Sequence, residues 1–93
     1  MIIGLMTIDL HSDQFHSLKE KRAVVQSIKE TVKHRFNVAV IESGHQELWQ
    51  RAQISLVSLA LSKPLLETLF RQVEEYILAN YSVERVGVEI TYP

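Results

Sequence analysis

The order of the hydrophobic periodicities constrains the fold of this chain more than any other feature. Residues 2 to 11 alternate between two apolar-rich sides, which is the pattern of a strand. Residues 18 to 35 instead place apolar side chains three and four positions apart, as an amphipathic helix does. Two β-rich stretches follow at 36–43 and 51–62, then a second helical pattern at 63–80 and a last alternating stretch at 85–92.

The predicted order is therefore β-α-β-β-α-β. With right-handed crossovers it indicates a ferredoxin-like α+β sandwich, in which two helices cover one face of a four-stranded antiparallel sheet. We expect residues 1–93 to form a single domain of this kind. The topology places segments 11–22, 45–51 and 80–82 at one pole of the molecule.

The stretch "HSLKEKR", residues 16–22, begins the first helix. Ser17 and Glu20 have the spacing of a capping box. Lys19, Lys21 and Arg22 lie where the helix dipole disfavours cations by about 0.3 to 1 kcal/mol each. An arriving phosphate would reverse that cost, so these three residues are candidates for binding phosphate or RNA. The alternative is a solvated helix flank with weak ion pairs.

Lys21 is unusual because it falls inside the apolar stripe of the helix. A buried unpaired charge is costly. We therefore expect Lys21 either to reach solvent at the helix end or to meet an acid such as Asp9, Asp13 or Glu47.

The stretch "HQELWQR", residues 45–51, falls in the predicted loop between the second and third strands. Arg51 is a further candidate for contacting phosphate. Trp49 either stacks on a base or covers one end of the core. In the second case Gln46 and Gln50 serve to fix the loop.

His16 and His45 are secondary candidates at the same pole. Together with His11 they offer three imidazoles, which a zinc ion can use. Their spacing matches no metal-binding motif, however. We predict no metal site and no cofactor.

Several classes of function are disfavoured by what the sequence lacks. It contains no cysteine, no Gly-rich phosphate loop, no G-x-S-x-G elbow and no H-E-x-x-H motif, so we do not expect an enzyme. The longest run without a charged residue, 52–62, is too short to cross a bilayer. The apolar start lacks a basic lead-in and is interpreted as a strand, not a signal peptide. We expect a cytoplasmic protein that does not bind membranes.

The net charge of -1 hides a local basic segment. Residues 17–35 hold six Lys or Arg against two Glu, whereas residues 36–93 hold four against seven acids. This distribution favours one basic patch over general binding of polyanions.

Both faces of the first and third predicted strands carry apolar side chains. Ile3 and Leu5 alternate with Met6 and Ile8. One layer of helices covers only one face, so the other face predicts self-association or a protein partner. These strands contain no aromatic residue, which disfavours RNA binding through the sheet.

The motifs "HSLKEKR", "RFNVAV" at 35–40 and "HQELWQRA" at 45–52 resemble the bacterial YlxP-like family, a domain of unknown function. The resemblance covers nearly the whole chain and implies a ferredoxin-like domain. Genes of YlxP-like proteins often lie beside those for a translation initiation factor and a ribosome-binding factor, which implies RNA or a ribosomal subunit as partner. The leading prediction is thus a non-enzymatic, ribosome-associated RNA-binding module. The alternative is a homo-oligomer formed through the open sheet face.

Overall fold

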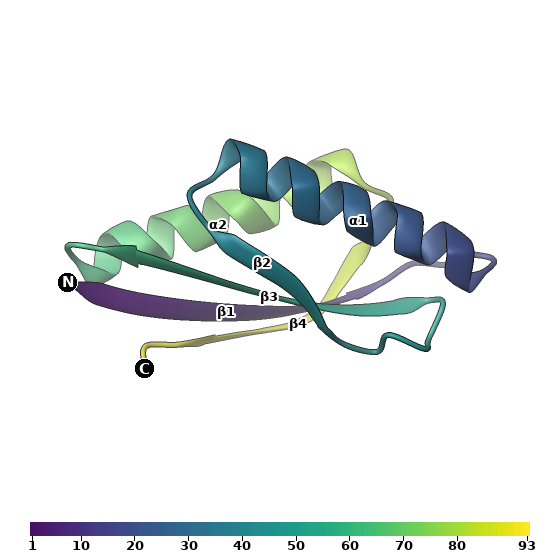
Figure 1. Cartoon of the computed structure of the whole chain (residues 1–93), viewed down its shortest axis with the longest axis horizontal. Helices are drawn as coiled ribbons and strands as arrows, with labels where there is room; N and C mark the ends of the chain where they lie inside the picture. Colours follow the sequence, from purple (N-terminus) through teal and green to yellow (C-terminus); the bar gives the residue numbers. More distant parts are fainter.

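The computed structural model describes all of residues 1–93 and has the predicted order of elements. The strands pair antiparallel in the order β2-β3-β1-β4, and both helices lie on one side of the sheet (Figure 1). The predicted ferredoxin-like α+β fold is confirmed. The six elements are β1 (Ile2–His11), α1 (Leu18–Arg35), β2 (Ala39–Gly44), β3 (Arg51–Ala60), α2 (Lys63–Asn80) and β4 (Glu84–Thr91).

The start of α1 forms through the predicted capping box. Ser17 is the N-cap, and its Oγ accepts a hydrogen bond of 3.1 Å from the Glu20 N–H. The Glu20 carboxylate in turn accepts one of 2.9 Å from the His16 N–H. These two bonds satisfy backbone donors that the helix cannot, and so fix where α1 begins.

The core lies between the helices and one face of the sheet. Alternate residues of β1 and β3 face it, and the helices contribute residues three and four apart. Gly4 lets α2 approach the sheet closely, because a Cβ there would lie 2.9 Å from Cε2 of Phe70. The fully buried cluster comprises Met6, Ile8, Leu10, Ile28, Val32, Ile54, Leu56, Leu66, Phe70, Val73 and Ile77.

The bounds of three strands differ from the prediction. β4 spans Glu84–Thr91 and is thus shifted by one residue from the predicted 85–92. β2 begins at Ala39 instead of Phe36, because the Phe36 N–H donates to Val32 O and so still belongs to the end of α1. β3 ends at Ala60, two residues early, where the chain turns into α2. Neither helix is long and apolar enough to span a membrane.

Candidate functional site

Lys21 is among the largest fully buried side chains, and it joins α1 to the loop between β2 and β3. Its Nζ donates to Glu42 Oε2 at 2.8 Å and to the carbonyl oxygens of His45 at 2.8 Å and Gln46 at 3.2 Å. The carbonyl of Arg51 lies 3.4 Å away. The ammonium group is thus paired with a carboxylate and also holds the backbone at both ends of one loop.

This geometry corrects the expectation for Lys21. The side chain meets an acid, as its position in the apolar stripe required, but the acid is Glu42 and not Asp9, Asp13 or Glu47. Because no part of the side chain is exposed, its ammonium group cannot contact a phosphate. Lys21 is therefore an architectural residue.

A signal for Glu42 was present in the sequence. Val40 and Glu42 lie two positions apart in β2, and they pair with Leu56 and Ile54, which face the core. Glu42 is thus an acid on the core-facing side of a strand, as Lys21 is a cation on the core-facing side of a helix. Two opposite charges on facing apolar surfaces predict a buried pair.

The β2–β3 loop, residues 45–50, is fixed by several further bonds. His45 has a φ of 58°, in the left-handed region, and its carbonyl accepts from the Leu48 N–H at 3.0 Å. Gln46 Nε2 donates to Glu42 O at 3.1 Å, and Gln50 Nε2 reaches Phe15 O at 3.5 Å. Both amide side chains therefore hold the loop to neighbouring backbone carbonyls.

The predicted pole is assembled, since its three segments are hydrogen-bonded to one another. The Ser12 N–H donates to Gln50 O at 3.0 Å, and Ser12 Oγ donates to Ser82 O at 2.6 Å. Together with the bonds of Lys21, these contacts join the end of β1, the β2–β3 loop and the segment after α2.

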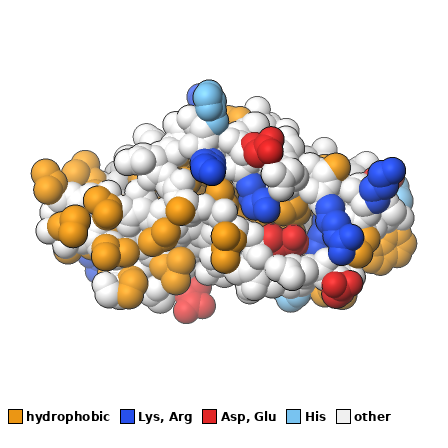
Figure 2. Space-filling model, in the orientation of Figure 1, with side chains coloured by type: hydrophobic (Ala, Val, Ile, Leu, Met, Phe, Trp, Pro, Cys, Tyr) orange, Lys and Arg blue, Asp and Glu red, His pale blue; other side chains and the backbone are white.

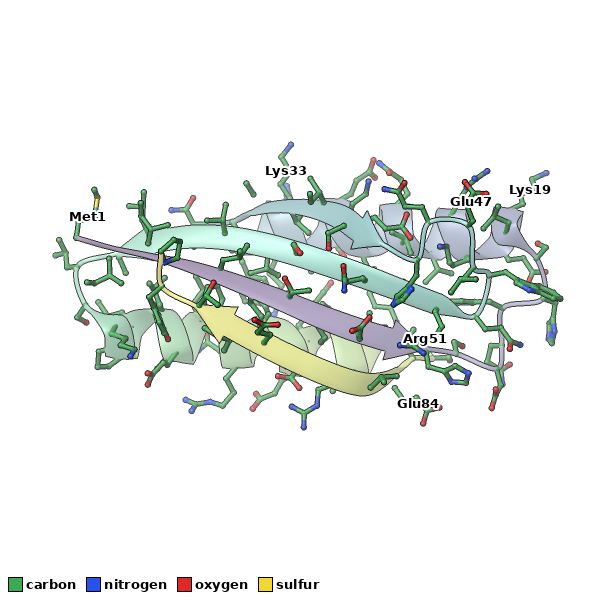
Figure 3. All side chains as sticks on the ribbon, turned by 90° about the horizontal axis from the view of Figure 1, so that it is seen from below. Met1, Lys19, Lys33, Glu47, Arg51 and Glu84 are labelled. Atoms are coloured by element: carbon green, nitrogen blue, oxygen red, sulfur yellow. The ribbon has the colours of Figure 1, made fainter.

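The predicted cation cluster does not form as one patch. Lys19 and Arg22 are exposed on α1, whereas Arg51 faces the side of the sheet that no helix covers. Figure 3 shows this open face. Arg51 lies over the sheet, while Lys19 extends outward from the first turn of α1. Arg51 Nη2 is also 3.9 Å from Asp9 Oδ1, so it has an acid beside it.

Trp49 is exposed over 49% of its surface, and its indole N–H donates to no protein group. Its side chain is thus available for contact with a partner. His16 is exposed, with its backbone N–H held by Glu20.

Two histidines, His11 and His45, lie beside carboxylates at the open face. His11 Nδ1 lies 2.8 Å from Glu84 Oε1, and His11 Nε2 is 3.5 Å from Asp13. His45 Nε2 is 3.1 Å from Asp9 Oδ1, but without the geometry of a hydrogen bond, so that oxygen has no partner. No three His, Asp or Glu side chains are grouped so that they would hold a metal ion.

A row of cations along α1 forms a second feature of the surface. Lys19, Arg22, Lys29 and Lys33 have no carboxylate within 4.0 Å, unlike Lys21, Arg51 and Arg85. Figure 2 shows Lys and Arg side chains spread along α1, while hydrophobic side chains gather over the opposite end of the molecule. The molecule therefore presents a basic helix surface and, separately, an open sheet face.

Comparison with known proteins identifies the family of this chain. The chain matches the family model described as "Protein of unknown function (DUF503)" over residues 3–90, and it belongs to this family. It is also 36% identical over 69 residues to the "Uncharacterized protein YlxP" of Bacillus subtilis (strain 168), a match that spans 74% of this chain and 75% of that protein. The predicted relationship to YlxP-like proteins is confirmed.

Proposed function

We propose that this chain is a non-enzymatic, cytoplasmic RNA-binding module that works near the ribosome and contacts the RNA backbone through the cations of α1. The observation that carries the proposal is the row of cations without ion pairs: Lys19, Arg22, Lys29 and Lys33. This row replaces the predicted cluster, because Lys21 is buried and Arg51 lies on another face.

The geometry of the row suits an extended polyanion. At 100° per residue the four cations fall within an arc of about 80° on α1, and 14 residues of helix separate the first from the last, or about 21 Å. Glu30 lies on the same side, but it accepts a hydrogen bond from Gln26 and makes no ion pair with Lys33. The side therefore retains a positive balance.

Counterion release supplies the energy for such binding. Each Lys or Arg that neutralises a phosphate contributes about 0.7 to the slope of log K against log salt for a single strand. Exposed surface cations without local ion pairs are the groups that gain most from a phosphate. The gene neighbourhood that the family resemblance implies favours RNA of the translation apparatus as the partner that supplies these phosphates.

The test is to measure binding of a labelled single-stranded RNA, and of isolated ribosomal subunits, at several salt concentrations. We expect Lys19→Ala/Arg22→Ala to weaken binding and to lower the salt slope by about 1.4. Lys63→Ala/Arg71→Ala is the matched control, because it also removes one exposed Lys and one exposed Arg, but from α2. Equal loss in the two variants, or no binding by the wild type, would overturn the proposal.

Self-association through the open sheet face is the second candidate function. It is favoured by the exposure of Ile3, Val57 and Leu59 to 41%, 37% and 57%. Sedimentation over a wide range of protein concentration tests it. A mass that stays at 10.7 kDa throughout would contradict it.

A further inference from the structure

The open face is divided along its strands into three zones. At the end near the chain termini it is apolar, with Ile3, Leu5, Val57 and Leu59 on the central strands and Ala39 and Ile41 on β2. The middle is polar: Thr7 Oγ1 lies 2.8 Å from Ser55 Oγ, Ser55 donates to Ser43 at 2.6 Å, and Glu89 lies beside Thr7 on β4. The far end is charged, with Asp9, His11, His45, Arg51 and Glu84.

The charged zone is divided again, this time across the strands. The acids Asp9 and Glu84 stand on β1 and β4, with His11 on β1 beside Glu84, on one side of the sheet's midline. Arg51 and His45 stand on β3 and on the loop after β2, on the other side. The face thus has one polarity along the strands and a second polarity across them.

These two polarities decide how a second copy can dock. A two-fold axis perpendicular to the strands would place each apolar zone over the partner's charged zone. An axis parallel to the strands, between β1 and β3, places apolar zone on apolar zone instead. It also places β3 over the partner's β1, and β2 over the partner's β4, so that the side with Arg51 and His45 faces the side with Asp9 and Glu84.

We infer that two copies of this chain dock through their open faces about a two-fold axis parallel to the strands. This inference rests on the self-association proposed above and specifies its geometry. The apolar zones pack against each other, and Arg51 of each copy stands over the partner's His11, which has the partner's Asp9 two residues away on β1 and the partner's Glu84 beside it on β4. The two sheets then have the aligned arrangement that twisted sheets adopt when they pack face to face.

The area that a stable pair needs explains why the charged zone must take part. β1 and β3 have ten residues each, which makes the face about 34 Å long, and four strands make it about 19 Å wide. Its flat area is about 650 Å², and a standard interface buries about 800 Å² of accessible surface per partner. The apolar zone is only part of this, so the complementarity of the charged zone decides the arrangement.

Two polar atoms of the charged zone lack a hydrogen-bond partner within the chain. Asp9 Oδ1 and Arg51 Nε are both shielded from solvent and make no hydrogen bond. Buried polar groups are normally paired, because an unpaired one costs about 1 to 3 kcal/mol. In the proposed pair the partner's Asp9 and the partner's Glu84 lie to either side of the residue above Arg51, and the partner's Gln53 lies above Asp9, so both side chains can complete their hydrogen bonding across the pair.

The first experiment asks whether the open face holds the pair together. Leu59→Asp places a charge in the apolar zone and should leave the chain monomeric in sedimentation at concentrations where the wild type is dimeric. Leu65→Asp is the matched control, because Leu65 is exposed to 56% against 57% for Leu59 but lies on α2. A dimeric Leu59→Asp variant would overturn the inference.

The second experiment asks for the direction of the axis, and the absence of natural cysteine makes single-cysteine variants unambiguous. In the proposed pair the two copies of position 59 lie at one level, about 11 Å apart. A short bis-maleimide should therefore link Leu59→Cys chains to each other, but not Leu59→Cys to Gln53→Cys in a mixture. Leu65→Cys should not link.

The outcomes separate this inference from the proposal beneath it. A perpendicular axis would put the two copies of position 59 roughly 27 Å or more apart and bring position 59 near position 53 of the partner. Preferential linking in the mixture would thus overturn the parallel axis but leave self-association standing. A wild type that stays monomeric at high concentration would overturn both and assign the face to a different occupant.

Discussion

Replacement of Lys21 by Met tests the buried pair that joins α1 to the β2–β3 loop. Met has a similar length but no charge, so the variant leaves Glu42, whose side chain is only 15% exposed, without its cation. The carbonyls of His45 and Gln46 also lose their donor. Breaking a buried pair on one side costs about 3 to 5 kcal/mol, and we expect the free energy of unfolding to fall by that amount.

A loss of this size is large for a domain of 93 residues. Small domains have a total stability of about 5 to 15 kcal/mol. For this size 1 kcal/mol corresponds to about 4 to 8 °C in Tm, so even the lower bound predicts a fall of about 12 to 24 °C. Urea unfolding at low temperature, followed by circular dichroism, measures the loss. The fluorescence of Trp49, the single Trp, reports on the loop itself.

Two further variants make the test specific. Lys19→Met removes an exposed cation two residues earlier on α1, and we expect it to change stability by no more than about 0.5 kcal/mol. Glu42→Met in the Lys21→Met background should restore much of the loss, because an apolar pair of similar volume can replace a buried ion pair. A Lys21→Met variant within about 1 kcal/mol of the wild type, or a coupling energy near zero in the double-mutant cycle, would refute the reasoning.

Two other predictions concern the packing of α2 and the end of the chain. Gly4→Ala should lower the free energy of unfolding by about 1 to 3 kcal/mol in urea melts, because its Cβ would press on the ring of Phe70; Gly87→Ala, with nothing within 4 Å, should have little effect. Burial, and secondly the charge of Glu67, raise the pKa of Tyr92 above its ordinary 10.0. The folded chain therefore holds the phenolic proton more tightly, so the stability that Tyr92 contributes is complete below pH 10 and is lost as pH rises through the folded pKa. Ultraviolet titration of the wild type against Tyr92→Phe checks this, and Glu67→Gln should lower the pKa.

The helices and their bounds were predictable because their signals are local. Ser17 and Glu20 predict the start of α1, and Pro64 predicts the start of α2. Both helices begin and end where the sequence indicates. The start of β2 was not predictable in this way, because the last turn of α1 still binds the Phe36 N–H. Strand bounds depend on partners that are distant in the sequence, and no local pattern contains that information.

The candidate site was only partly predictable. The meeting of its segments at one pole of the molecule was predicted, because the topology alone brings these segments together. The grouping of Arg51 with Lys19 and Arg22 was a weaker inference, since alternation with the buried Ala52 and Ile54 already places Arg51 on the opposite side of β3. The contact of His45 with Asp9 depends on a left-handed residue and a loop geometry that sequence periodicity does not encode.

The position of Lys21 has a consequence for any search for function within the family motifs. Its ammonium group holds the loop that carries His45 and leads into Arg51, which belong to the open face. Lys21 itself lies in the first two turns of α1, between the exposed Lys19 and Arg22. One buried bond network thus supports both proposed surfaces. We therefore expect a Lys21 variant to weaken RNA binding and self-association together, although Lys21 would contact neither partner. An activity can be assigned to one surface only by replacing exposed residues of that surface.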